Sequence, residues 1–295
     1  MIVAVASGKG GTGKTTVAVS LAVALACQSD WGQVDHDGLR VRLVDCDVEE
    51  PNAHLFLKPE IQWRQDVGVL TPVVDEDRCT HCRRCVEVCA FHAIAVIAEK
   101  VLVFAELCHG CGSCAFNCPE NAIREELRVT GVIEKGSAGK IDFAHGVLNV
   151  GEAMAVPVIR ELKKCVGKGE AAILTVLDAP PGTSCPVVAT LAGADYALMV
   201  TEPTPFGLHD LKLAVKVARD ELGLPVGVVV NRDGFGDQGV DEYCKAEGIP
   251  ILLRIPLDRR IAEAYSEGVD LVSAVPEYRD LFLELYRKIR RGASG

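Results

Sequence analysis

The sequence predicts an α/β protein in which a mostly parallel β-sheet is flanked by helices and interrupted by a small α+β insert. Three features of the 295-residue chain support this prediction. A short apolar strand leads through a glycine-rich loop into an apolar helix within residues 2–26. Apolar strands then alternate with helical stretches, which is typical of a parallel sheet with helices on both faces. Eight cysteines between residues 79 and 118 interrupt this alternation.

The individual elements follow from the hydrophobic pattern. Short, uniformly apolar, β-prone runs are expected of strands that are buried on both faces. We expect strands near residues 2–6, 41–45, 172–177, 195–200, 226–230 and 250–254. Longer stretches of helix-forming residues predict helices near residues 14–27, 152–164, 186–193, 207–222, 239–247, 258–266 and 277–291. In this fold class ligands bind where the carboxyl ends of the strands meet.

Composition limits the classes of function. The net charge of −10 argues against nonspecific nucleic-acid binding, which needs a basic surface. We find no run of 18 or more apolar residues and no signal peptide, so we expect a cytoplasmic protein and no membrane binding. The chain has 13 cysteines, and in a reducing cytosol these favour metal or cluster ligation over disulfides.

The glycine-rich loop predicts a nucleotide site. Residues 8–15 fit the pattern G-x-x-x-x-G-K-[ST] between a strand and a helix, the context that a phosphate-binding loop needs. Lys14 would reach the β- and γ-phosphates and the Thr15 hydroxyl would bind Mg²⁺. A chance match in a glycine-rich turn is the alternative. The expected nucleotide contacts are Gly8, Gly10, Gly11, Thr12, Gly13, Lys14, Thr15 and Thr16.

A second lysine, Lys9, directly follows the first glycine of this loop. With it, residues 9–16 (KGGTGKTT) resemble the deviant Walker A loop of the MinD/Mrp/ParA superfamily of SIMIBI-class P-loop ATPases. The resemblance covers roughly residues 1–70 and 125–295. It implies ATP hydrolysis in a homodimer that closes on ATP, with Lys9 reaching the partner's nucleotide as an arginine finger does elsewhere. A solvated loop lysine is the alternative.

The resemblance also assigns residues at other strand ends. Asp45 and Asp47 match the first switch of the family and would bind Mg²⁺ or position the attacking water; caps of a turn or helix are the alternative. In residues 178–182 (DAPPG), Asp178 would hold Mg²⁺ through water and the Gly182 amide would sense the γ-phosphate. Asn231 would contact the adenine, and residues 255–265 would pack against it.

The cysteine block is an internal repeat. The spacing C-x2-C-x2-C-x3-C occurs twice, offset by 29 residues, and matches the run found in bacterial ferredoxins. In that pattern the fourth cysteine of each run ligates the other cluster. We therefore expect two [4Fe–4S] clusters. Cys79, Cys82, Cys85 and Cys118 would bind one of them, and Cys89, Cys108, Cys111 and Cys114 would bind the other.

Zinc is the competing interpretation of these cysteines. Structural zinc sites, however, use two separated C-x-x-C pairs and not three cysteines within seven residues followed by a fourth. The chain then divides into residues 1–72 and 125–295, which form the ATPase domain, and an inserted ferredoxin domain at residues 73–124. Because the insert interrupts a continuous fold, its chain ends should lie close together. His81 and His109 would tune the clusters through hydrogen bonds rather than bind iron.

Two further features leave alternatives open. Cys185 lies in the second switch, where the related nitrogenase iron protein has a cluster ligand, so it is either an extra ligand, with Cys165 as a conceivable companion, or a small buried residue. The last helix has an apolar stripe of Leu281, Phe282, Leu285, Tyr286 and Ile289. We expect this stripe to pack on its own domain rather than on a membrane.

These features predict an iron–sulfur ATPase whose nucleotide-driven dimer closure gates electron transfer to a redox enzyme. The alternative is an assembly factor or carrier that delivers an iron–sulfur or metal cluster to an apo-protein, as Mrp-type relatives do. A MinD- or ParA-type spatial regulator is the third hypothesis, and the cysteine block argues against it. Resemblance of fold alone does not decide between them.

Overall fold

The structure is a computed structural model that describes residues 1–27, 40–167 and 173–293. Its centre is a nine-stranded sheet with the order β11-β10-β9-β1-β8-β2-β7-β6-β3. From β11 to β7 all neighbouring strands are parallel. At the other edge, β6 (Ile123–Ala138) is antiparallel to β7, and β3 (Glu60–Val74) is antiparallel to β6. The parallel strands are β1 (Ile2–Ala6), β2 (Arg40–Asp45), β7 (Ile141–Leu148), β8 (Ile173–Asp178), β9 (Tyr196–Thr201), β10 (Val226–Asp233) and β11 (Ile251–Pro256). The expected mostly parallel sheet is confirmed.

Helices cover both faces of this sheet. Along β1, Val3 and Val5 point into one core, and Ala4 and Ala6 point into the other. The first core lies under α1 (Lys14–Ala26), α2 (Ala53–Leu57), α9 (Arg259–Ser266), α10 (Leu271–Ala274) and α11 (Tyr278–Ala293). The second lies under α5 (Val156–Val166), α6 (Cys185–Leu191), α7 (Pro205–Val215), the π-helix Lys216–Glu221 and α8 (Gly239–Ala246).

The predicted elements are found with small shifts at their ends. The predicted helix 207–222 begins two residues earlier and changes to a π-helix after Val215. Residue 172, the first of the predicted strand 172–177, lies outside the described residues. In α11, Phe282, Leu285, Tyr286 and Ile289 are buried in the first core, which confirms packing on its own domain. Leu281, which we placed on the same stripe, is 45% exposed.

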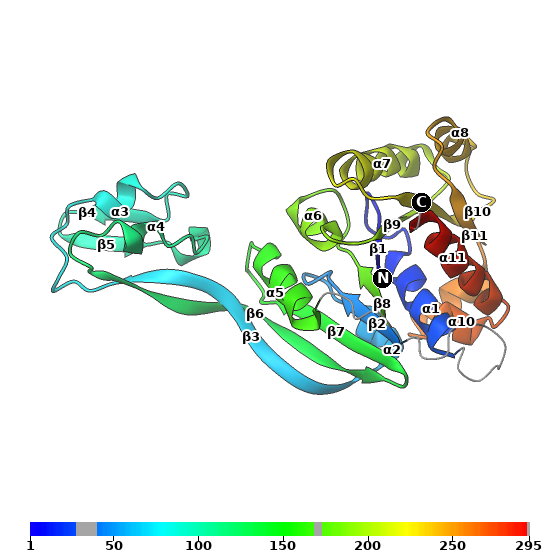
Figure 1. Cartoon of the computed structure of the whole chain (residues 1–295), viewed down its shortest axis with the longest axis horizontal. Coiled ribbons are helices and arrows are strands. Elements are labelled where there is room, and N and C mark those ends of the chain that lie inside the picture. Colours follow the sequence, from blue (N-terminus) through cyan, green and yellow to red (C-terminus); the bar gives the residue numbers. More distant parts are fainter. Residues whose placement is uncertain (28–39, 168–172, 294–295) are drawn as a thin grey trace.

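The sequence did not predict the long ribbon of β3 (Glu60–Val74) and β6 (Ile123–Ala138). This antiparallel ribbon begins at the edge of the sheet and continues away from the body as an arm (Figure 1). Much of the ribbon is exposed, so its strands lack the continuous apolar run expected of buried strands. Pairing between two segments about 60 residues apart holds it together, and this pairing leaves no local signal.

The cysteine-rich module lies at the far end of the arm (Figure 1). Its elements are α3 (Arg84–Glu87), β4 (Ile94–Ile97), β5 (Lys100–Val103), a short 3-10 helix (Ala105–Leu107) and α4 (Ser113–Phe116). The chain ends of the module lie side by side as expected, because Val74 pairs with Ile123 and the Asp75 amide donates to the Ala122 carbonyl at 2.7 Å.

The sequence repeat is also a repeat of the backbone. Helices α3 and α4 are offset by the same 29 residues as the cysteines. The backbone of His81 and Arg83 is left-handed, like that of Gly110 and Gly112 at the equivalent positions. Two non-glycine residues thus adopt a conformation that costs roughly 1 kcal/mol or more each. Both halves of the module therefore wrap their cysteines in the same loop shape.

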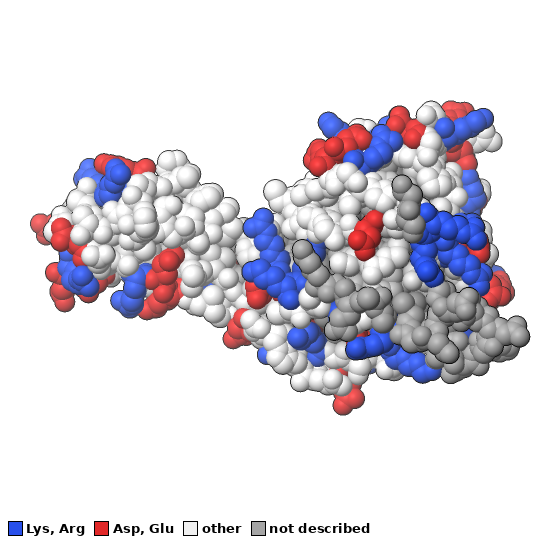
Figure 2. All heavy atoms as spheres, in the orientation of Figure 1, with Lys and Arg blue, Asp and Glu red and all other residues white. Residues whose placement is uncertain are grey.

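Among the described residues, none of the helices combines the length and the apolar character that a membrane-spanning segment requires. On the face drawn in Figure 2, the module carries both acidic and basic side chains around a largely uncharged centre. This face of the module therefore lacks the continuous basic surface that nucleic-acid binding uses.

Candidate functional site

The glycine-rich loop joins β1 to α1 and leaves the N-terminus of α1 open to a ligand. Gly13 is the N-cap of α1 and has φ +92°, and no side chain caps the helix. Side chains would obstruct two places in the loop. A Cβ on Gly13 would lie 2.4 Å from Nδ2 of Asn231, and one on Gly8 would lie 2.1 Å from the Asp210 carbonyl oxygen of α7. The free amides at this helix end form a site suited to phosphate.

A cavity of about 1390 Å³, including space open to solvent, lies against this loop. The predicted residues that line it are Gly10, Gly11, Gly13, Lys14, Thr15, Thr16, Asp47 and Asn231. Seven residues between Ile255 and Tyr265 form another wall, and Pro181 of the second switch lies opposite the loop. Several segments that are distant in sequence therefore surround one cavity large enough for a nucleotide.

The two acids at the C-terminal end of β2, Asp45 in the strand and Asp47 after it, have different environments. Asp45 is fully buried, and its carboxylate accepts hydrogen bonds from the amides of Asp47, Asn52 and Ala53 at 3.0–3.1 Å. This geometry favours the capping interpretation of Asp45 over Mg²⁺ ligation. Asp47 lines the cavity instead. Burial and the nearby Asp45 raise the pKa of Asp47 to about 6, against the opposing effect of Lys14.

Asp178 has an environment suited to a cation ligand. It is fully buried at the end of β8, and neither of its oxygens has a hydrogen-bond partner among the described residues. Burial and the charge of Asp45 raise its pKa, and Thr15 and Lys14 oppose this effect. An unpaired buried carboxylate beside a threonine hydroxyl is a donor set that fits Mg²⁺, directly or through water.

The second switch lies against the glycine-rich loop. The Gly182 amide, which we expect to sense a γ-phosphate, donates to the Ser7 carbonyl at 3.1 Å. A contact between this amide and a phosphate would require that bond to be exchanged. Cys185 is exposed at the first position of α6, so its burial as a small apolar residue is excluded. Cys165 lies on α5 with its Sγ 3.9 Å from Oε1 of Gln65.

Asn231 supports the loop as well as lining the cavity. Its Nδ2 donates to the Thr12 carbonyl at 2.8 Å, and its Oδ1 accepts from the amide of Arg232 at 2.9 Å. One N–H of the side-chain amide remains for a base. The residue therefore links the loop to β10 in addition to its expected contact with adenine.

Lys9 forms a contact that the sequence did not predict. Its Nζ lies 3.2 Å from Oε2 of Glu202, which is 7% exposed. Glu202 also binds Arg232, with Nη1 2.5 Å from Oε1. A single carboxylate after β9 shows no motif, and only the order β10-β9-β1 of the sheet brings the three side chains together.

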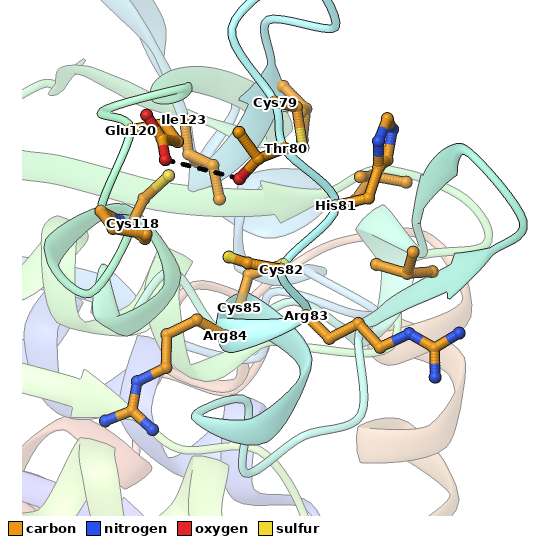
Figure 3. A pocket seen from close by; sticks show the side chains of 14 residues that line it. Cys79, Thr80, His81, Cys82, Arg83, Arg84, Cys85, Cys118, Glu120 and Ile123 are labelled. Carbon is orange, nitrogen blue, oxygen red and sulfur yellow. Dashed lines mark hydrogen bonds between the residues drawn. The ribbon is translucent and has the colours of Figure 1, made fainter.

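The eight repeat cysteines line two separate pockets in the predicted groups of four. Cys79, Cys82, Cys85 and Cys118 line the first, of about 370 Å³ including open space. Figure 3 shows Cys118 on a separate loop from Cys79 and Cys82, and Cys85 lies on α3. Cys89, Cys108, Cys111 and Cys114 line the second. Each group thus combines three cysteines of one run with the fourth of the other.

The described residues contain no group of three His, Cys, Asp or Glu side chains close enough to bind one metal ion. A four-iron cluster needs wider spacing because iron and sulfide lie between the thiolates. Amides already point at the sulfurs, since Ala93 and Ala122 donate to Sγ of Cys89 and Cys118 at 3.3 Å. These two bonds occupy equivalent positions in the repeat. The donor chemistry therefore fits iron–sulfur ligation, whose potentials depend on such bonds.

The thiols in these pockets differ in acidity. Burial raises the pKa of Cys85, and it raises that of Cys114 to about 11. The hydroxyl of Ser113 hydrogen-bonds Cys111 and lowers its pKa. Thiolates are the ligand form, so binding iron at Cys85 and Cys114 would release protons. Next to the second pocket, the rings of Phe91 and His109 stack with centroids 3.8 Å apart.

Comparison with known proteins supports the fold and the nucleotide site. Residues 3–272 match the family described as the CobQ/CobB/MinD/ParA nucleotide binding domain. The chain is 32% identical to an uncharacterized protein of Methanocaldococcus jannaschii, covering 95% of this chain and 93% of that one. It is 25% identical to a protein of the same organism named iron-sulfur cluster carrier protein, covering 97% and 84%.

The solved structure of the septum site-determining protein MinD with Mg-ADP from Pyrococcus horikoshii superimposes with a TM-score of 0.58 at 21% identity. The alignment covers 98% of this chain and 95% of that one. At this identity the likeness establishes the α/β P-loop fold alone. The family match over most of the chain agrees with the glycine-rich loop, the cavity and the order of the sheet. This chain belongs to the CobQ/CobB/MinD/ParA family of nucleotide-binding proteins.

Proposed function

We propose that this protein is an ATP-hydrolysing iron–sulfur cluster carrier. The observation that carries this proposal is the presence, in one chain, of a P-loop cavity and two complete four-cysteine pockets at the end of an arm. The relative named an iron-sulfur cluster carrier protein supports delivery of clusters over gated electron transfer, which was our first hypothesis.

In this proposal Lys14 binds the nucleotide phosphates. Mg²⁺ is held by Thr15, Asp47 and Asp178, and Asn231 contacts adenine. The protein is a homodimer when ATP is bound, and Lys9 of each subunit neutralises charge on the partner's nucleotide. Exchange of the Gly182 amide from Ser7 to the γ-phosphate would report the nucleotide state to the second switch.

The module at residues 73–124 is a ferredoxin-like domain that holds two [4Fe–4S] clusters. The clusters supply one-electron chemistry or are themselves the cargo. An acceptor apo-protein is the expected partner. Cys185 is exposed on the second switch, and in a dimer two copies would be available to hold a cluster in transit.

Gated electron transfer remains the second candidate. The four cysteines in each pocket and the amide bonds to sulfur at matched positions favour clusters that stay with the protein during turnover. The two functions differ in whether iron leaves the chain.

The decisive experiment uses anaerobically purified protein with about eight irons per chain. The protein is mixed with an apo-ferredoxin acceptor and a chelator, with ATP, with a non-hydrolysable analogue or without nucleotide. A carrier transfers cluster to the acceptor faster with ATP, and iron per chain falls. If all iron stays bound and EPR shows that the clusters are reduced reversibly, cluster transfer is excluded and electron transfer is supported.

A further inference from the structure

The three charged groups Lys9, Glu202 and Arg232 form a cluster beside the nucleotide cavity. Lys9 follows β1, Glu202 follows β9, and Arg232 lies near the end of β10, and these three strands are neighbours in the sheet. The side chain of Glu202 is 9% exposed, whereas those of Lys9 and Arg232 are 33% and 52% exposed. A nearly buried carboxylate therefore holds two cations that both reach solvent.

The backbone fixes Glu202 in place. Its backbone carbonyl accepts a hydrogen bond from the Thr204 amide at 2.8 Å. The same oxygen packs closely on Gly207, where an added Cβ would lie only 2.2 Å away. The backbone carbonyl of the next residue, Pro203, accepts a hydrogen bond from the Asp237 amide at 2.9 Å. The backbone at Glu202 therefore has little freedom to move, and burial and Arg232 hold its side chain, so we expect separation of the pair to come from the lysine.

Lys9 is suited to move. It lies between Gly8 and Gly10, and no other ion pair of its ammonium is found among the described residues. While the ammonium is 3.2 Å from Glu202, the carboxylate cancels most of its field at any phosphate. Lys9 can stabilise charge on a second subunit's nucleotide only after it leaves Glu202.

Arg232 makes this separation feasible. A buried carboxylate that loses its only partner is strongly destabilising. Here Arg232 stays bound to Glu202 when Lys9 departs, so the carboxylate remains paired. The backbone of Arg232 is left-handed, with φ 54°, and its amide donates a hydrogen bond to the Asn231 side chain. The protein therefore maintains a strained residue at the position that keeps Glu202 paired.

We propose that Glu202 is a positioning residue that holds Lys9 within its own subunit until ATP-driven dimerisation draws the lysine across the interface. This ion pair between Lys9 and Glu202, which we call the latch, rests on the proposed trans role of Lys9. It opposes dimerisation, and Arg232 weakens it by competing for the same carboxylate. Removal of the carboxylate should promote the dimer, and removal of the arginine should hinder it.

The test is sedimentation velocity of the full chain over a range of protein concentrations with a non-hydrolysable ATP analogue and Mg²⁺. Glu202→Gln should dimerise at about tenfold lower concentration, since each partly exposed pair contributes about threefold and a dimer opens two of them. The exposed Glu221→Gln, which carries the same change in charge, should match the wild type. An unchanged or higher dimerisation concentration for Glu202→Gln overturns the latch.

Arg232→Met supplies an independent test if Glu202→Gln does not fold. It should raise the dimerisation concentration at saturating nucleotide, and an unchanged or lower value overturns the latch. Lys9→Ala separates the two proposals. If Lys9→Ala dimerises like the wild type, the trans role of Lys9 fails and the latch falls with it. If Lys9→Ala fails to dimerise while Glu202→Gln is unchanged, only the latch is refuted.

Discussion

Asp178→Asn should stabilise the nucleotide-free protein and abolish its response to Mg²⁺ and ATP. Asp178 is fully buried with both carboxylate oxygens unpaired among the described residues, and burial and Asp45 raise its pKa. At neutral pH the folded chain either keeps an uncompensated charge or protonates the group at a free-energy cost. Asparagine has nearly the same shape and carries no charge.

The size of the effect follows from the surroundings of the carboxylate. A poorly paired polar group in a protein interior costs about 1–3 kcal/mol, and Lys14 already offsets part of the charge. We therefore expect the free energy of unfolding to rise by about 1–2 kcal/mol. For a chain of this size that raises the melting temperature by roughly 2–6 °C.

The assay is thermal unfolding with and without Mg²⁺ and ATP at about 100 times the dissociation constant. Wild type should gain about 2.7 kcal/mol from the ligand, and Asp178→Asn should gain little. The exposed Asp220→Asn should lie within about 0.5 kcal/mol of wild type in both conditions. If Asp178→Asn is less stable than wild type and still responds to ligand, Asp178 is not the unpaired cation-binding acid described above.

Three further predictions concern other parts of the chain. Lys163→Met should lower the free energy of unfolding by about 2–3 kcal/mol, because Lys163 donates to three carbonyls at the C-terminal end of α6 at 2.6–2.8 Å. The exposed Lys164→Met should change it by less than about 0.5 kcal/mol in denaturant titrations, and equal effects would refute this assignment. Cys85→Ser should lose about four of eight irons in anaerobic iron analysis, whereas Cys27→Ser should lose none; full retention would contradict the pocket assignment. Because the folded pKa of Asp47 is raised to about 6, its protonated form stabilises the nucleotide-free protein below the unfolded pKa, and that contribution is lost as pH rises through about 6. The wild type should therefore lose about 1–3 kcal/mol relative to Asp47→Asn between pH 4 and 7, and parallel pH profiles would disprove the shift.

Local sequence was sufficient where a structure depends on neighbouring residues. The strand, loop and helix around Lys14 follow from a contiguous segment, because the glycine conformations and the free helix end are local properties. The two cysteine groups follow from the repeated spacing within residues 79–118, because the ferredoxin pattern assigns the fourth cysteine of each run to the other group. The sequence could not rank Asp45 against Asp47, since both end the same strand and differ only in which way the chain turns afterwards.

The fold class, the phosphate-binding loop and the grouping of the eight cysteines could all be predicted from the amino-acid sequence. The ribbon that carries the module became apparent only in the folded structure, because its strands pair across the whole insert and are too exposed to show an apolar pattern. The folded structure was also needed to place Glu202 against Lys9, which is 193 residues away in the chain. That contact exists because β1 and β9 are neighbours in the sheet, and strand order is set by packing over the whole domain.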